Sequence, residues 1–419
     1  MQLQKSLRWV VLCISVGLSV GLSCSAFLYS LNWVWRFQVS HQETIFLLPV
    51  VALVLTFFFQ KFASHFSDPS RLIIEEIHDP KRVLPIMVAP FVFIGSLVSH
   101  FAGASTGREG AAVQISVSIT DQLSRYLRMD ISERKNLLIA GTGAAFGVAI
   151  GAPIAGIFFG MEMVYVGKLK IIAFFECVLV SYIAFEVSRL LNIPHYALPR
   201  PSGVDFDFMH FVWIAVAGLV FGLVARVFIL TLHSIQHLVK QLKLALVWKN
   251  LTGAILLSAL FFIESSFHYC SLGLFEIEKA LSAKVSIAMP ILKFAFTILS
   301  ISSGMKGGEF TPLIFIGSSL GSALSEWIPV GAPVLASLGF AAVFSGAAQV
   351  PFTCAILSCE LFGWQLAPYA ITACFLSYYV SGGASIYGGQ KILQSKHSAL
   401  FEYFELLKRL GLKLLKKSV

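Results

Sequence analysis

The stretch AAFGVAIGAPIAGIFFGME, residues 144–162, decides the fold, because AVFSGAAQVPFTCAILSCE at residues 342–360 repeats its spelling 198 positions later. Both stretches place a phenylalanine, a proline and a glutamate at the same spacing. In the first stretch these are Phe146, Pro153 and Glu162. An internal repeat in an apolar chain is typical of a transporter whose site lies where two duplicated halves meet.

The repeat predicts two membrane halves. We expect them at residues 1–195 and 208–390, joined by a Pro-rich linker at 196–207 and followed by a basic tail at 391–419. The spacing between the halves leaves their relative orientation open.

The amino-acid composition indicates whether the protein folds in water or in a lipid bilayer. Hydrophobic residues make up 57% of the 419 residues and charged residues 13%, and the mean hydropathy is +0.81. These values indicate an integral membrane protein. We predict an all-α polytopic fold in which long apolar helices span the bilayer, while shorter segments rich in Gly and Pro form tilted, broken or re-entrant helices. The segments expected to be broken lie near residues 103–118, 141–165, 304–325 and 340–362.

The basic residues predict the orientation in the membrane. Lys5 and Arg8 lie near the N-terminus, and further basic residues gather at 125–135, at 240–249 and in the tail. The positive-inside rule places these parts, and both termini, in the cytoplasm. This bias also accounts for the net charge of +9, so the sequence does not indicate a nucleic-acid partner.

The sequence lacks the patterns of an enzyme or a metalloprotein. The seven cysteines occur singly, the ten histidines are scattered, and no Walker or HExxH motif is present. We therefore expect no metal and no cofactor, and we do not expect an enzyme.

The segment GREGAAVQ, residues 107–114, carries the first candidate chemistry. Glu109 is an ionisable group in an apolar region, where such groups are costly and therefore suspected of function. Neighbouring glycines let backbone N–H groups approach an anion, and a helix that begins here directs its positive end to the same point. A deprotonated Glu109 would occupy the site as a tethered anion, and a protonated one would leave it. The alternative is a structural ion pair with Arg108.

Three motifs together resemble those of the CLC family of chloride channels and anion/proton exchangers. They are GREGAAVQ, the segment from Gly143 to Glu162, and GGEFTPLIFIGSSLG at residues 307–321. The resemblance implies two inverted halves and a homodimer with one anion pathway in each subunit. It also implies anion sites built from helix N-termini, with Glu109 as the gating and proton-accepting residue. The anion-binding residues that it implies are Arg108, Gly110, Phe310, Thr311 and Tyr387.

Departures from the chloride-type pattern resemble the fluoride-exporting branch. Met163 stands where many exchangers have a second, inner glutamate, and the third motif carries Glu309 and Thr311. Leu72–His78 has the LxxExIH spelling of that branch. The methionine typical of the branch is missing between residues 61 and 85, which leaves fluoride and chloride both open.

The residue that replaces that methionine is sought at Ser67 or Ser70, because a hydroxyl can donate to an anion. The alternative there is a loop or a helix cap at Ser-Asp-Pro-Ser.

Four further residues have competing interpretations. For Glu162 and Glu360, which end the two repeated stretches, helix capping is favoured over ion transfer. Glu309 is a candidate for coupling to protons or fluoride, the alternative being an ion pair with Lys306 or Arg108. Lys306 could also raise the local anion concentration.

The resemblance to the CLC family therefore implies halide/proton antiport, of fluoride or chloride, in a prokaryotic inner membrane. A passive chloride channel is the alternative.

Overall fold

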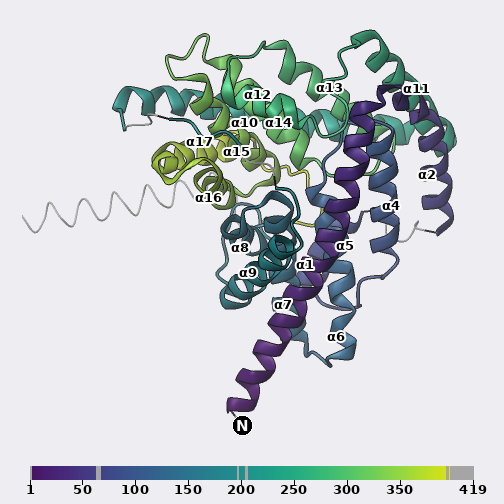
Figure 1. Ribbon diagram of the computed structural model, residues 1–419, viewed down its shortest axis with the longest axis vertical. Helices are drawn as coiled ribbons and strands as arrows, with labels where there is room; N and C mark the ends of the chain where they lie inside the picture. Colours follow the sequence, from purple (N-terminus) through teal and green to yellow (C-terminus); the bar gives the residue numbers. More distant parts are fainter. Residues whose placement is uncertain (1, 63–67, 196–197, 203–205, 393–395, 397–419) are drawn as a thin grey trace, which may run out of the picture.

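The structure is a computed structural model that describes residues 2–62, 68–195, 198–202, 206–392 and 396 (Figure 1). The regular secondary structure of the described residues is helical, apart from two isolated β-bridges. The first half contains α1 (Gln2–Ser40), α2 (Leu48–Phe62), α3 (Pro69–His78), α4 (Val88–Phe101), α5 (Glu109–Asp121), α6 (Leu123–Tyr126), α7 (Ile131–Ile150), α8 (Pro153–Glu162) and α9 (Phe174–Leu190).

The second half repeats this order. It contains α10 (Phe208–Gln241), α11 (Leu246–Glu264), α12 (Leu274–Ser282), α13 (Ala288–Ser302), α14 (Phe310–Leu324), α15 (Ala332–Ala348), α16 (Pro351–Phe362) and α17 (Ala367–Val380). With the short α6 set aside, α1–α9 correspond one by one to α10–α17. The fold is thus the predicted pair of inverted halves.

Helix lengths separate spanning elements from broken ones. Among the described residues, four helices are long and apolar enough to cross a membrane: Gln4–Ser40, Gln42–Phe62, Phe208–Gln241 and Leu246–Glu264. By contrast, α8 has 10 residues and α16 has 12. At 1.5 Å per residue they reach about 15–18 Å, roughly half of the hydrocarbon core. The predicted broken helices are confirmed here.

Backbone and side-chain hydrogen bonds cross between the halves in reciprocal pairs. Ser105 N donates to Ser300 Oγ over 3.0 Å, and Lys306 N donates to Ser99 Oγ over 2.9 Å. Ser300 lies 201 residues after Ser99, and Lys306 lies 201 residues after Ser105. The two bonds therefore join the same two positions with the halves exchanged. Reciprocal contacts of this kind are what a two-fold relation between the halves requires.

A second reciprocal pair caps the short helices. The carboxylate of Glu162 accepts hydrogen bonds from Phe352 N at 3.0 Å, and from Thr353 N at 2.8 Å and Thr353 Oγ1 at 2.7 Å. In the symmetry-related arrangement, Glu360 accepts hydrogen bonds from the backbone N–H groups of Ile154 and Ala155, at 3.0 and 2.8 Å. Each glutamate satisfies the free N–H groups at the start of the other half's helix. The capping interpretation is confirmed for both residues.

Small residues allow α7 and α8 to fold back on each other. A Cβ atom placed on Gly156 would lie 2.6 Å from Gly143 O and 2.9 Å from Gly147 Cα, so a larger residue would force the helices apart. The turn between the helices passes through Gly151 with φ +87°. This close packing holds the buried start of α8 inside the protein.

Candidate functional site

The site forms where the first and third motifs meet. Gly107 N donates to Gly308 O over 2.6 Å, and Gly308 N donates to Gly107 O over 2.7 Å. A Cβ atom on Gly107 would lie 2.9 Å from both Gly308 O and Thr311 N, and one on Gly110 would lie 3.3 Å from Gly308 Cα. Glycine is therefore required for the two segments to approach this closely.

The pair of hydrogen bonds between Gly107 and Gly308, which we call the glycine bridge, brings two helix N-termini together. α5 begins at Glu109 and α14 at Phe310, and neither start has a side-chain cap in the described part of the chain. The first N–H groups of a helix have no partner within it, and the helix dipole adds partial positive charge there. Two such ends meeting in the protein interior favour negative charge at this point.

The Glu109 carboxylate lies at this meeting point and is 3% exposed. Its Oε2 accepts a hydrogen bond from Thr311 Oγ1 at 2.6 Å and one from Arg108 N at 3.2 Å. Its Oε1 faces Arg108 Nε at 3.4 Å, a long ion pair between two buried side chains. The carboxylate of one half is thus bound in the first turn of α14, which belongs to the other half.

A cluster of aromatic rings lies beside this meeting point. Phe310 makes edge contacts with Phe344 and Phe146, with ring centroids 4.5 and 5.3 Å apart. Phe146 stacks on Phe159 at 3.8 Å, and Phe159 contacts the edge of Tyr387 at 6.3 Å. Tyr387 is therefore linked to Phe310 through two intervening rings. We did not predict Phe146, Phe159 or Phe344 as site residues, although the first and last belong to the repeated spelling.

Lys306 and Glu309 lie on the segment that leads into α14. The Lys306 ammonium lies over the Phe59 ring, 4.0 Å from its centroid, in a cation–π contact. Glu309 occupies the N-cap position of α14 and is partly buried. Glu309 therefore directly precedes Phe310 in the chain and lies within one turn of Thr311.

The serine candidates have different positions. Ser67 lies outside the described residues. The hydroxyl of Ser70 accepts a hydrogen bond from Gln114 Nε2 at 2.8 Å, which ties the start of α3 to α5. Asp68 caps α3 by accepting from Arg71 N at 3.1 Å, so the predicted helix cap is present.

Among the described residues, no group of three or more His, Cys, Asp or Glu side chains is arranged to hold a metal ion. The described residues at the site supply two helix N-termini, the Thr311 hydroxyl and the Glu109 carboxylate.

Comparison with known proteins identifies close relatives. The chain is 35% identical over 396 residues to the Chloride/fluoride channel protein of Pseudomonas syringae pv. tomato, which covers 93% of this chain and 88% of that protein. It is 28% identical over 389 residues to the H(+)/Cl(-) exchange transporter ClcA of Salmonella arizonae, covering 83% and 79%.

Solved structures show the same fold. The crystal structure of a CLC-type fluoride/proton antiporter superposes with a TM-score of 0.87 at 30% identity, covering 91% of this chain and 97% of that one. A slow cyanobacterial Cl-/H+ antiporter gives a TM-score of 0.79 at 21% identity, with 91% and 96% covered, and shows the fold alone. Residues 51–382 match the family described as Voltage gated chloride channel. The chain therefore belongs to this family, the CLC family of anion-transporting integral membrane proteins.

Proposed function

We propose that the protein exchanges halide anions, fluoride in preference to chloride, for protons. We further propose that Glu109 takes part in the movement of the anion and in that of the proton. The observation that carries the proposal is the 2.6 Å hydrogen bond from Thr311 Oγ1 to Glu109 Oε2 at the start of α14. A carboxylate in this position takes the place that an anion would occupy at a helix N-terminus.

Protonation of Glu109 is the proposed switch. A deprotonated carboxylate is held by the Thr311 hydroxyl, by Arg108 and by the two helix dipoles. A proton removes its charge and with it most of this attraction. The Thr311 hydroxyl and the N–H groups at the starts of α5 and α14 can then donate to a halide ion. The deprotonated carboxylate and the halide ion would thus compete for a single position, and a proton on Glu109 would favour the halide.

Similarity to proteins that handle fluoride supports fluoride as the preferred anion. The relatives described above include a chloride/fluoride channel protein and a fluoride/proton antiporter, at 35% and 30% identity.

Glu309 lies next to Phe310, and we propose it as the group that couples proton transfer to anion movement from the second half. In this proposal Phe310 contributes its backbone N–H, and Tyr387 reaches the central anion from the far side of the aromatic cluster.

A passive channel is the second candidate, and Met163 favours it. Met163 is buried, and its carbonyl accepts a hydrogen bond from Gln390 Nε2 at 2.8 Å. This position follows Glu162, whose carboxylate is occupied in capping α16. Without an ionisable side chain at 163, protons have no carrier here, and antiport depends on Glu309.

Flux from proteoliposomes tests the proposal. Vesicles are loaded with the potassium salt of fluoride or of chloride, and valinomycin is added so that K⁺ efflux compensates the charge that the anion carries. An ion electrode and a pH probe record simultaneously. Fluoride efflux with proton uptake supports the antiporter. Anion flux without proton movement establishes the channel, and chloride flux that greatly exceeds fluoride flux overturns the proposed preference.

We further propose that both termini face the cytoplasm and that the protein resides in a prokaryotic inner membrane. An ion pair between Arg8 and Glu133, at 2.9 Å, and a bond from Arg8 Nη2 to Arg128 O, at 2.8 Å, join the N-terminus to the basic segment 125–135. Two of the basic regions therefore lie on one face, as the positive-inside rule requires.

The proposed assembly is a homodimer in the lipid bilayer. Mass measurement of the detergent-solubilised protein by light scattering tests it, because a monomer of 45.9 kDa and its dimer differ twofold in protein mass.

A further inference from the structure

A buried histidine closes the turn between α4 and α5. His100 lies in the last turn of α4 and is 0% exposed. Its Nδ1 lies 2.8 Å from Ser96 O, and its Nε2 lies 3.2 Å from Thr106 O. The imidazole therefore joins its own helix to the segment that leads into Glu109. The two-fold related position, 201 residues later, is Ile301, so the second half has an apolar residue there.

Both ring nitrogens of His100 face carbonyl oxygens. A carbonyl oxygen only accepts hydrogen bonds, and a neutral imidazole carries a single N–H. The Ser96 hydroxyl lies 3.5 Å from Nδ1, which is longer than an ordinary hydrogen bond. Only a protonated imidazole can donate to Ser96 O and to Thr106 O together. The two acceptors thus fit the charged form of His100.

The Thr106 carbonyl belongs to the peptide group that takes part in the glycine bridge. The N–H of the same peptide, Gly107 N, donates across the bridge over 2.6 Å. The next N–H, Arg108 N, donates to Glu109 Oε2 at 3.2 Å. A peptide group is planar, so hydrogen bonds at both of its ends fix its orientation. His100 therefore orients the backbone that presents Arg108 N to the site.

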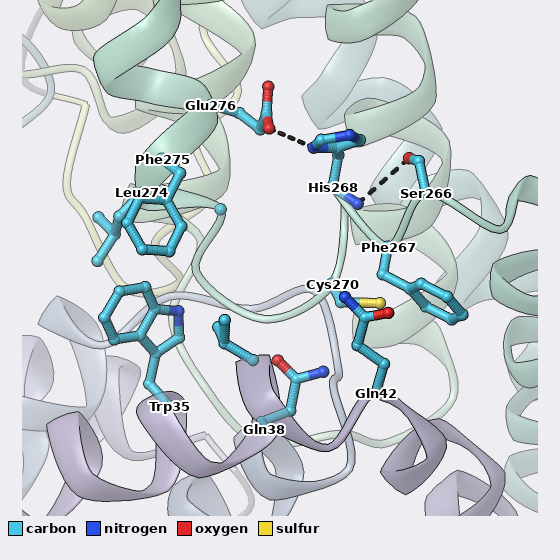
Figure 2. Close-up of a pocket in the computed structure, with 12 residues that line it drawn as sticks. Trp35, Gln38, Gln42, Ser266, Phe267, His268, Cys270, Leu274, Phe275 and Glu276 are labelled. Atoms are coloured by element: carbon cyan, nitrogen blue, oxygen red, sulfur yellow. Dashed lines mark hydrogen bonds and ion pairs between the residues drawn. The ribbon is translucent and has the colours of Figure 1, made fainter.

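The other side of this turn borders a cavity of about 280 Å³, which Figure 2 shows. A Cβ atom on Gly103 would lie 3.3 Å from Gln38 Nε2 and 3.8 Å from Cys270 Cβ, and both residues line the cavity. The cavity reaches the surface at His268, whose side chain is 47% exposed. Solvent protons thus have a route to the turn that His100 closes.

The charges around His100 link its proton to the anion. Lys293 of α13 and Arg108 act on it electrostatically, and Lys306 packs against α4. Glu109 is the carboxylate paired with Arg108. Positive neighbours oppose a further positive charge on the imidazole, and an anion beside them offsets this opposition. An anion at the starts of α5 and α14, whether carboxylate or halide, therefore favours the protonated form of His100.

We infer that His100 binds a proton when an anion occupies the site, and that the protonated imidazole positions the peptide between Thr106 and Gly107 for anion binding. This inference rests on the proposed function, because it concerns the anion that takes the place of the Glu109 carboxylate. By linkage, halide binding increases proton binding at His100, and a lower pH strengthens halide binding. His100 is a positioning residue, and its proton is distinct from the one that Glu109 carries.

The number of protons taken up per halide bound tests the inference. Calorimetric titration of the purified full-length protein with NaF, repeated in buffers of different ionisation enthalpy, gives this number between about pH 4 and 8, a range that spans the ordinary ionisation of histidine. NaCl is titrated as well, since chloride itself takes up no proton in this range. The background protein carries Glu109→Gln and Glu309→Gln, so that neither carboxylate near the site contributes.

The background protein should take up as much as about one proton per halide, and its halide affinity should rise by as much as about tenfold per pH unit as the pH falls. Adding His100→Gln should remove both the uptake and the pH dependence. The matched control adds His233→Gln, at an exposed position of α10, and should change neither. Gel filtration verifies that each variant is folded.

The possible outcomes separate this inference from the proposed function. Proton uptake that persists in His100→Gln, or equal weakening of halide binding at every pH, overturns the inference, because a purely structural residue would behave in this way. Halide binding without proton uptake in the background protein overturns it too and leaves the proposed exchange intact. This last measurement keeps His100 in place, so it does not depend on the folding of His100→Gln. A folded background protein that binds no halide overturns the proposed competition at Glu109 together with the inference.

Discussion

At the scale of single residues, Glu109 is held from two sides. Arg108 precedes it in its own half, and Thr311 donates to it from the other half at 2.6 Å. The charge of the carboxylate is what Arg108 and the helix dipoles attract, whereas the Thr311 hydroxyl can donate to a neutral amide as well. Charge and hydrogen bonding can thus be separated by substitution.

Glu109→Gln should abolish proton coupling while leaving the protein folded. Glutamine keeps the shape of the side chain and an acceptor for Thr311, but it cannot carry a proton at working pH. Simultaneous recording of fluoride and pH in proteoliposomes checks this, with Glu326→Gln, a surface glutamate paired to Lys284 at 3.3 Å, as the control. Proton movement that survives in Glu109→Gln would refute the role given to Glu109.

Thr311→Val should weaken halide binding, and Thr311→Ser should retain it. Valine matches threonine in shape but lacks the hydroxyl that donates at the start of α14. A hydrogen bond to a charged group contributes about 1.5–3 kcal/mol, so we expect roughly a 10- to 100-fold loss of apparent affinity. Flux measured against fluoride concentration gives this value. Equal affinities for Val and Ser would show that the hydroxyl does not contact the anion.

At the scale of elements, Glu162 and Glu360 join the halves by capping each other's short helix. Glu162→Gln and Glu360→Gln should each destabilise the protein by about 1–3 kcal/mol, because a charged acceptor is replaced by a neutral one. Glu162 accepts three hydrogen bonds and Glu360 two, so the first change should cost more.

Thermal unfolding in detergent measures these losses, with the exposed Glu278→Gln as the control. Proton coupling should persist in both capping variants. If either variant loses coupling at unchanged stability, that glutamate transfers ions rather than caps.

The sequence predicted these elements better than it predicted their contacts. The repeated spelling of Phe146, Pro153 and Glu162 located two helix breaks, because a break at proline is a local property of the chain. It also marked Glu162 and Glu360 as capping residues by their matching positions, but not that each would cap a helix of the other half. Ser99 and Ser300 carry equally reciprocal bonds but lie 201 residues apart in unremarkable apolar helices. Their roles depend on how closely the halves approach, and this follows from packing.

The loop between α11 and α12 was unpredictable for a related reason. Its course depends on positive φ at Ser265, Phe267 and Ser271, residue types that do not indicate such a backbone. The carboxylate where α5 and α14 meet was different. Glu109 could be found because a carboxylate between glycines is conspicuous in an apolar region.

At the scale of the whole molecule, α1 connects opposite faces (Figure 1). Arg8 near its start bonds to Glu133, and Trp35 near its end packs on Phe275 of α12, with ring centroids 5.3 Å apart. With 39 residues the helix is about 58 Å long, more than the thickness of a bilayer. The segment near α6 and the segment near α12 should therefore meet different compartments.

Labelling with a membrane-impermeant maleimide should reveal this arrangement. All seven native cysteines are buried, so the unaltered protein should react little. Tyr126→Cys, at a position 82% exposed, should be labelled only from the cytoplasmic face, and Lys279→Cys on α12 only from the outside. Labelling of both from one side would contradict the orientation proposed above.

The glycine bridge at the centre has a consequence for how such a molecule can diversify. Two identical chains around a two-fold axis would carry the same residue at every related position. Here one continuous chain has Gly107 and Gly308 alike on the axis, but Glu109 opposite Phe310 and Gly110 opposite Thr311. Because both halves belong to one chain, residues at related positions can differ. The first half carries the Glu109 carboxylate, and the second half carries the Thr311 hydroxyl that donates to it. The halves therefore share the same order of helices but contribute different functional groups to the site.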